Sequence, residues 1–143
     1  MQLQMLAPGA ALALWSLIVL LWLAISRFSA FSKAGIDVRQ APPGLRGGDI
    51  EDKLPPPVVW KAHNYTHLME QPTIFYPTVV ILAMLGAGAT DVMLAWAYVA
   101  LRIAHSIWQA TVNTIPVRFS LFILATICLL VLAINAFKLT VLA

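Results

Sequence analysis

The sequence predicts an all-α membrane protein, a bundle of four transmembrane helices. Of its 143 residues, 61% are hydrophobic and only 10% are charged, whereas a soluble domain is typically about 45–50% apolar and about 25% charged. No Asp, Glu, Lys or Arg occurs in residues 1–26, 71–90 or 119–137, and residues 92–117 contain only Arg102. Each window is close to the ~20 residues that cross a bilayer as a helix. This pattern excludes both a water-soluble domain and a disordered chain.

The predicted helices belong to one domain that spans residues 1–143. We expect them at about residues 10–28, 57–85, 91–111 and 116–137, with a polar loop at 33–56. Residues 33–57 hold eight of the 15 charges, five of the nine prolines and four of the seven glycines, a composition typical of an extramembrane loop. Pro72 and Pro77 predict a kink in the second helix. Thr90 or Asp91 is expected to cap the third helix.

The distribution of basic residues predicts the orientation in the membrane. Seven Lys and Arg residues lie in or beside the first and third loops, whereas only Lys138 lies near the C-terminus. Cytoplasmic loops carry the excess of basic residues, so we expect these two loops in the cytoplasm and both termini on the other side. No basic patch is interleaved with aromatic residues, so no nucleic-acid partner is expected. The single cysteine, Cys128, lies in an apolar window and indicates neither a disulfide nor a reactive thiol.

Ionisable side chains at membrane depth are costly, so each is a functional candidate. His63, His67 and Glu70 are spaced i, i+4 and i+7 in the second predicted helix. Arg102, His105 and Gln109 are spaced i, i+3 and i+7 in the third predicted helix, so they also share one face. Arg118 lies at the start of the fourth predicted helix.

Less specific interpretations of these residues stay open. Glu70 and Arg102 can form a structural ion pair that fixes the order of the helices. His63, His67 and Glu70 resemble a metal-binding helix face, but they lack the His-Glu-x-x-His order, and we expect no metal. His105 can be a hydrogen-bonded histidine inside the bundle.

Two segments carry a resemblance to a known family. Residues 61–72 read KAHNYTHLMEQP, residues 100–105 read ALRIAH, and Arg118 follows Arg102 by sixteen positions. The Glu-x-Pro at Glu70 and the Arg-x-x-His at Arg102, with the later arginine, resemble the MAPEG family, the membrane-associated proteins of eicosanoid and glutathione metabolism. The resemblance also covers the chain length, the four-helix plan and the polar first loop.

This resemblance implies a homotrimer that binds glutathione between neighbouring subunits, near the cytoplasmic side. Glu70 and Arg102 match the residues that help to hold glutathione in family enzymes. Arg118 matches an arginine that activates the thiol or its target, and His105 matches the family histidine. Arg102 and Arg118 are therefore the expected catalytic residues, and glutathione is the expected cofactor.

The chain departs from the family pattern at three positions. His63 stands where family enzymes commonly have arginine, His67 where they have asparagine, and Gln109 where they have tyrosine. His63 could replace the arginine only in its protonated form. The variant pattern is similar to a bacterial-type branch, which implies a multi-pass protein of a bacterial inner membrane. Two functions remain open: a glutathione transferase or peroxidase acting on lipophilic electrophiles, or a non-catalytic protein of the same fold that binds membrane lipid or modulates a partner.

Overall fold

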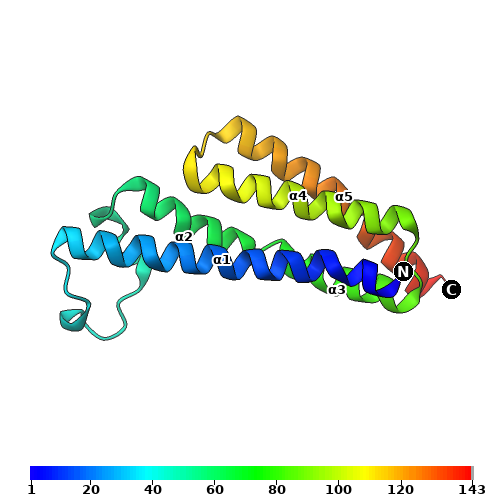
Figure 1. The fold of residues 1–143 in the computed structure, drawn as a ribbon, viewed down its shortest axis with the longest axis horizontal. Coiled ribbons are helices and arrows are strands. Elements are labelled where there is room, and N and C mark those ends of the chain that lie inside the picture. Colours follow the sequence, from blue (N-terminus) through cyan, green and yellow to red (C-terminus); the bar gives the residue numbers. More distant parts are fainter. Residues whose placement is uncertain (143) are drawn as a thin grey trace.

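The structure is a computed structural model that describes residues 1–142, which form an elongated all-α bundle (Figure 1). The helices of this part of the chain are α1 (Gln2–Ala34), α2 (Pro56–Leu68), α3 (Pro72–Leu85), α4 (Ala89–Thr111) and α5 (Ile115–Val141). The 3-10 helices η1 (Val38–Gln40) and η2 (Gly47–Lys53) lie in the polar loop. No strand occurs in residues 1–142, which confirms the predicted class.

The long helix α1 organises the bundle. It packs against α2, α3 and α4, while α5 packs against α4 and α3, and α2 also contacts α4. Both termini lie at one end of the molecule, and the loop between α1 and α2 projects from the other end (Figure 1). The loop lies beside the end of α1 and the start of α2 (Figure 1).

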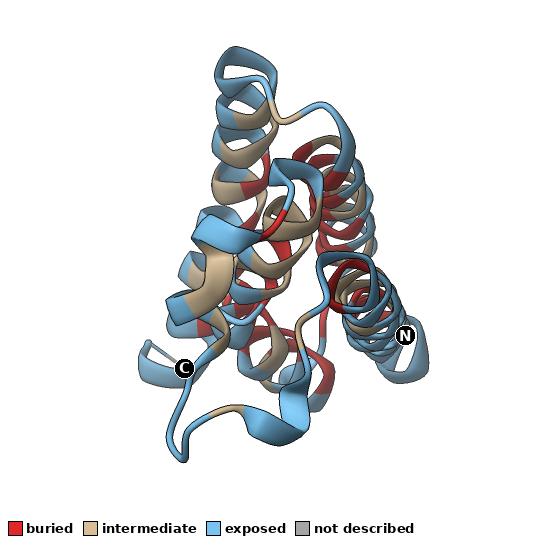
Figure 2. Cartoon of the chain, turned by 90° about the vertical axis from the view of Figure 1, so that its left-hand side faces the viewer, coloured by how far each residue is buried: buried red, intermediate tan, exposed pale blue. Residues whose placement is uncertain are grey.

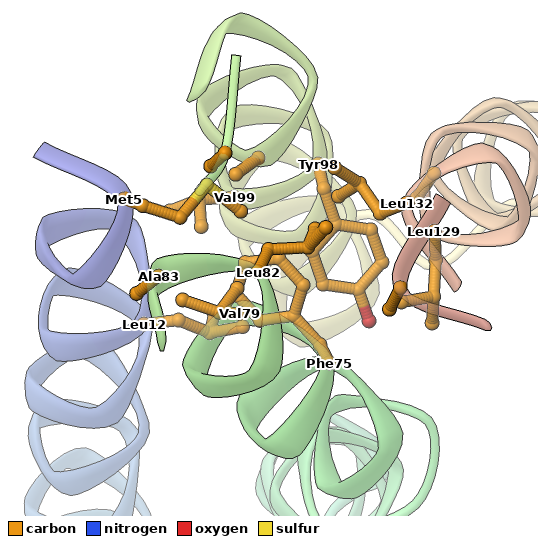
Figure 3. Close-up of a cluster of buried hydrophobic side chains, with 14 of the residues drawn as sticks. Met5, Leu12, Phe75, Val79, Leu82, Ala83, Tyr98, Val99, Leu129 and Leu132 are labelled. Carbon is orange, nitrogen blue, oxygen red and sulfur yellow. The ribbon is translucent and has the colours of Figure 1, made fainter. Parts of the chain in front are cut away.

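The apolar core gathers side chains from four helices. Met5 and Leu12 of α1 meet Phe75 and Leu82 of α3, and Figure 3 shows them beside side chains from the other two helices. Those are Tyr98 and Val99 of α4 and Leu129 and Leu132 of α5. The buried faces point inward and the outer faces are exposed (Figure 2). The exposed outer faces are rich in leucine, isoleucine and phenylalanine, as is typical of helices surrounded by lipid.

Three segments of residues 1–142 are long and apolar enough to cross a membrane: α1, α2 together with α3, and α5. The helix α4 is not among them, because it carries a row of polar residues. That row is buried and consists of Asp91, Arg102, His105, Ser106 and Gln109. By length and composition, three segments of residues 1–142 are therefore suited to cross a membrane, and the crossing of α4 stays a prediction.

The second predicted helix, 57–85, is one apolar segment, Pro56–Leu85, that is interrupted between α2 and α3 before Pro72, whereas Pro77 lies inside α3 without ending it. The chain turns at residues 69–71 between α2 and α3. Pro72 has no N–H to donate to the carbonyl of Leu68, so the helical ladder ends there. The N–H of Thr73 instead bonds to the carbonyl of Glu70.

The other three predicted helices are longer in the structure than expected. The helix α1 runs from Gln2 to Ala34, not from residue 10 to 28, because it continues through Pro8 and because no proline or glycine follows residue 28 before Gly35, which ends it at φ 68°. The helix α4 begins at Ala89 with Gly88 as its cap, so Thr90 and Asp91 are not the capping residue. Asp91 instead stabilises the start of the helix from within its first turn, because its carboxylate accepts a hydrogen bond from the N–H of Gly88 at 2.9 Å. The helix α5 starts one residue earlier than predicted and continues to Val141.

Candidate functional site

Arg102 of α4 is fully buried, and its guanidinium is held by the end of α2. Its terminal nitrogen Nη2 donates to the backbone carbonyl of His67 at 3.0 Å, and the same nitrogen lies 3.0 Å from Nδ1 of the His67 ring. The last carbonyls of a helix lack intrahelical donors and attract cations. The break that follows α2 therefore creates the binding place for this arginine.

The contact with Arg102 fixes the protonation of His67. A guanidinium can only donate hydrogen bonds, so Nδ1 of His67 accepts the bond, and the ring is neutral with its proton on Nε2. Within residues 1–142, Nε2 has no hydrogen-bond partner, and it is not among the polar atoms sealed from the surroundings. His67 thus keeps one free N–H donor.

Two imidazole rings lie face to face beside this arginine. His67 stacks on His105 with ring centroids 4.8 Å apart and planes 18° apart. Phe122 of α5 meets the edge of His67, at 5.5 Å and 64°. The stack joins α2 to α4 and borders α5.

A hollow of about 180 Å³ opens beside this stack. Its lining combines the two histidines and Arg118 with an apolar wall formed by Ile115, Phe119 and Phe122. The Nη1 atom of Arg118 donates to Oδ1 of Asn113 at 2.6 Å. Asn113 lies in the turn between α4 and α5 with φ 57°. The structure therefore brings together four of the predicted residues, Arg102, Arg118, His67 and His105, around one place.

Glu70 does not join them within the described chain. Its side chain forms no ion pair with a residue of 1–142, and the residue is exposed. The predicted pair with Arg102 is thus replaced by the contact with His67. The reason is the break after Leu68: the i, i+7 relation that placed Glu70 on the face of His63 requires a continuous helix.

His63 also lies apart from the hollow. Its Nε2 is 3.1 Å from Oε2 of Glu51, and Oε1 of Glu51 is 4.0 Å from Arg27. His63 therefore faces the loop, whereas His67 faces Arg102. In residues 1–142, no three His, Cys, Asp or Glu side chains gather in a way that could hold a metal ion.

Gln109 is buried on α4, and its Oε1 has no hydrogen-bond partner within the described residues. It does not line the hollow. The Nε and Nη1 atoms of Arg102 and Oδ1 of Asn64 are likewise buried without a partner. Unmet donors and acceptors of this kind are costly. Arg102 itself is fully buried and does not line the hollow, so it acts on that space only through His67.

Sequence reasoning missed several polar contacts. The Oγ of Ser106 accepts from Asn64 at 2.8 Å and from Trp15 at 3.0 Å. Ser106 follows Arg102 by four residues, a spacing that could have placed it on the same face. Phe122 follows Arg118 by four residues in the same way. Asn64 thus joins α2 to α4, directly beside the site.

The comparisons with known proteins agree with this picture at the level of the family. The sequence model described as "MAPEG family" matches residues 5–138, nearly the whole chain. No curated protein and no solved structure matches the sequence significantly. Together with the apolar helices and the arginine and histidine cluster, this match shows that the chain is a member of the MAPEG family.

Proposed function

We propose that this protein is a glutathione-dependent membrane enzyme, a transferase or peroxidase, that acts on lipophilic electrophiles. The observation that carries the proposal is the hollow in which Arg118, His67 and His105 face an apolar wall. A permanent cation and an imidazole N–H border the same small space, which suits a polar reactive group on one side and an apolar molecule on the other.

The residues of the hollow have distinct roles in this proposal. Bound glutathione supplies a thiol, which reacts as the thiolate. The guanidinium of Arg118 keeps its charge at any relevant pH, so it favours negative charge on an atom in the hollow. The Nε2–H of His67 is a second donor. Arg102 is a positioning residue, because it holds Nδ1 of His67 and so keeps the proton on Nε2.

The apolar wall explains the preference for lipophilic electrophiles. Ile115, Phe119 and Phe122 line the hollow, and the first two are largely exposed on α5. A water-poor wall strengthens the charge interactions inside the hollow. A molecule dissolved in the bilayer could approach along the same apolar surface.

The remaining predicted residues fit a site completed by a second subunit. The hollow in one protomer is smaller than a tripeptide, so the rest of glutathione would lie outside it. Glu70 is exposed and free to contact a ligand or a neighbour. A homotrimer with glutathione in a cleft between subunits, near the cytoplasmic side, accounts for both features.

The experiment measures glutathione binding and turnover by the purified, detergent-solubilised protein. Binding is followed by calorimetry, and turnover with 1-chloro-2,4-dinitrobenzene and with a lipid hydroperoxide. Arg118→Gln should lower kcat by about 10²-fold, the usual effect of losing one charge-stabilising donor, with smaller changes in glutathione affinity. Lys138→Gln is the control, because it removes a basic residue at the far end of the same helix.

One observation favours the second candidate, a non-catalytic lipid-binding or modulating protein. His63 stands at the position of the family arginine but is engaged by Glu51, so this glutathione anchor is occupied. The absence of turnover of either substrate, with or without glutathione binding, would support that candidate. The absence of both binding and turnover would contradict the proposed glutathione-dependent activity.

A further inference from the structure

A second hollow, distinct from the histidine site, lies between the end of α1 and the start of α2. Its volume is about 330 Å³. Two lysines and two serines contribute its polar lining, together with small apolar residues. The polar side chains are Ser26, Ser29, Lys33 and Lys53. None of the four forms a side-chain hydrogen bond or ion pair with residues 1–142.

The charges of the loop are segregated around this hollow. No acidic residue lines it, although the loop contains four acidic residues. Glu51 and Asp52 instead line a separate hollow with His63. Consecutive residues, Asp52 and Lys53, thus border different spaces. The hollow beside α1 therefore presents only cationic and hydroxyl donors.

A ridge of α1 leads from this hollow into the apolar part of the helix. Leu17, Leu21, Ile25, Ser29 and Lys33 follow one another at four-residue steps, which places them along one ridge. The three apolar members are 58%, 63% and 70% exposed. Along the ridge the side chains are hydrocarbon up to Ile25, and then carry a hydroxyl at Ser29 and an ammonium at Lys33. The change occurs where the charge-free window of the sequence ends, at residue 26. This is the order of groups in a phospholipid, from acyl chain to phosphate.

We propose that the hollow lined by Ser26, Ser29, Lys33 and Lys53 binds the phosphate of an anionic phospholipid, with an acyl chain along the ridge of α1. Basic residues at the membrane surface attract anionic lipids of the adjacent leaflet. The hydroxyl groups and ammonium groups donate to the phosphate oxygens. The exposed leucine and isoleucine side chains favour a lipid over a soluble phosphate, because only a lipid covers them.

The test compares lipid retention by native mass spectrometry of the full chain in uncharged detergent. The probes are phosphatidylglycerol and phosphatidylcholine with identical acyl chains. The parent protein should retain phosphatidylglycerol roughly tenfold more tightly. Lys33→Gln with Lys53→Gln should abolish this preference, whereas Lys33→Arg with Lys53→Arg should keep it. The matched control, Arg39→Gln with Lys138→Gln, removes the same number of charges and should also keep the preference.

Several results would overturn the proposal. Equal retention of the two lipids by the parent protein would exclude an anionic headgroup site. An equal loss in the control variant would show attraction by overall charge rather than by the hollow. Competition by inorganic phosphate at the affinity of the lipid would assign the site to a soluble anion. A change of oligomeric state in the lysine variant, seen by size-exclusion chromatography, would assign this face to a subunit contact.

Discussion

His67 connects the buried arginine to the hollow. Its backbone carbonyl and its Nδ1 atom both accept hydrogen bonds from Arg102. Its ring stacks on His105 and borders the hollow. Family enzymes commonly have asparagine at this position. An asparagine side chain can also accept from a guanidinium. A histidine adds a flat ring and a donor on its far edge.

We predict that His67 is neutral with its proton on Nε2. The reason is that Arg102 can only donate, so Nδ1 must accept. Nitrogen NMR of ¹⁵N-histidine-labelled protein should show one histidine with a pyridine-like Nδ1 signal that disappears in His67→Asn. His63→Asn is the control and should leave that signal in place. A proton found on Nδ1 of His67 would contradict the contact with Arg102.

We also predict that Arg102 is coupled to His67 more strongly than to Glu70. Truncating His67 to Leu leaves buried donors of Arg102 unmet, which costs about 1–3 kcal/mol of stability. A double-mutant cycle of Arg102→Met and His67→Leu is measured by thermal unfolding in detergent. The interaction free energy between the two changes should be about 0.5–3 kcal/mol, the range for residues in contact. The Arg102→Met and Glu70→Gln cycle should be nearly additive. Equal coupling in both cycles would show that Glu70 reaches Arg102 in the assembled protein.

At the scale of elements, the turn between α2 and α3 has the largest consequences. It ends α2 at Leu68 and removes Glu70 from the face of α2. The carbonyl of His67 then accepts from Arg102 at 3.0 Å as well as from the N–H of Glu70 at 3.3 Å. It also places Gln71 between two helices, where its amide donates to Thr126 at 2.9 Å and accepts from Tyr98 at 3.2 Å. A single proline thus shapes both the site and the contact between α4 and α5.

The polar loop is tied to the helices through Glu51. Its carboxylate contacts Arg27 of α1 and His63 of α2. We predict that Glu51→Gln loosens the loop, because an uncharged amide loses the charge attraction to Arg27 and is a weaker partner for the imidazole of His63. Hydrogen exchange should accelerate in η2 and stay unchanged in α3 and α5.

Asp52→Asn is the matched control for this change. Asp52 is the adjacent acidic residue, and it forms no ion pair within residues 1–142. Exchange in η2 should therefore be nearly unaffected by Asp52→Asn. Equal acceleration in both variants would show that the net charge of the loop, and not the Glu51 contacts, holds it in place.

At the scale of the whole molecule, the loop lies at the end opposite both termini. The basic residues predict that the loop end is cytoplasmic. A cysteine placed at the exposed position of Leu45, in a Cys128→Ala background, should resist an impermeant thiol reagent added to intact cells. It should react once the cells are lysed. Labelling from outside would reverse the proposed orientation.

The sequence by itself determined the class of this protein and its family. Long charge-free windows exist only where lipid or a helix bundle surrounds the chain, so composition sufficed to predict an all-α membrane protein. The Glu-x-Pro and Arg-x-x-His patterns pointed to the MAPEG family, which the family match confirmed. Pro72 also marked the place of the interruption, because a missing N–H is a local property of the chain.

Only the tertiary structure decided which polar residues meet. Helical periodicity places residues on a common face only while the helix is continuous, and the break after Leu68 invalidated that assumption for Glu70. The partner of Arg102 lies 35 residues away in the sequence, and the partner of His63 lies 12 residues away in a loop. Such pairs depend on which helix faces pack together. Packing depends on the whole bundle, so the histidine stack and the lysine-lined hollow emerged only from the fold.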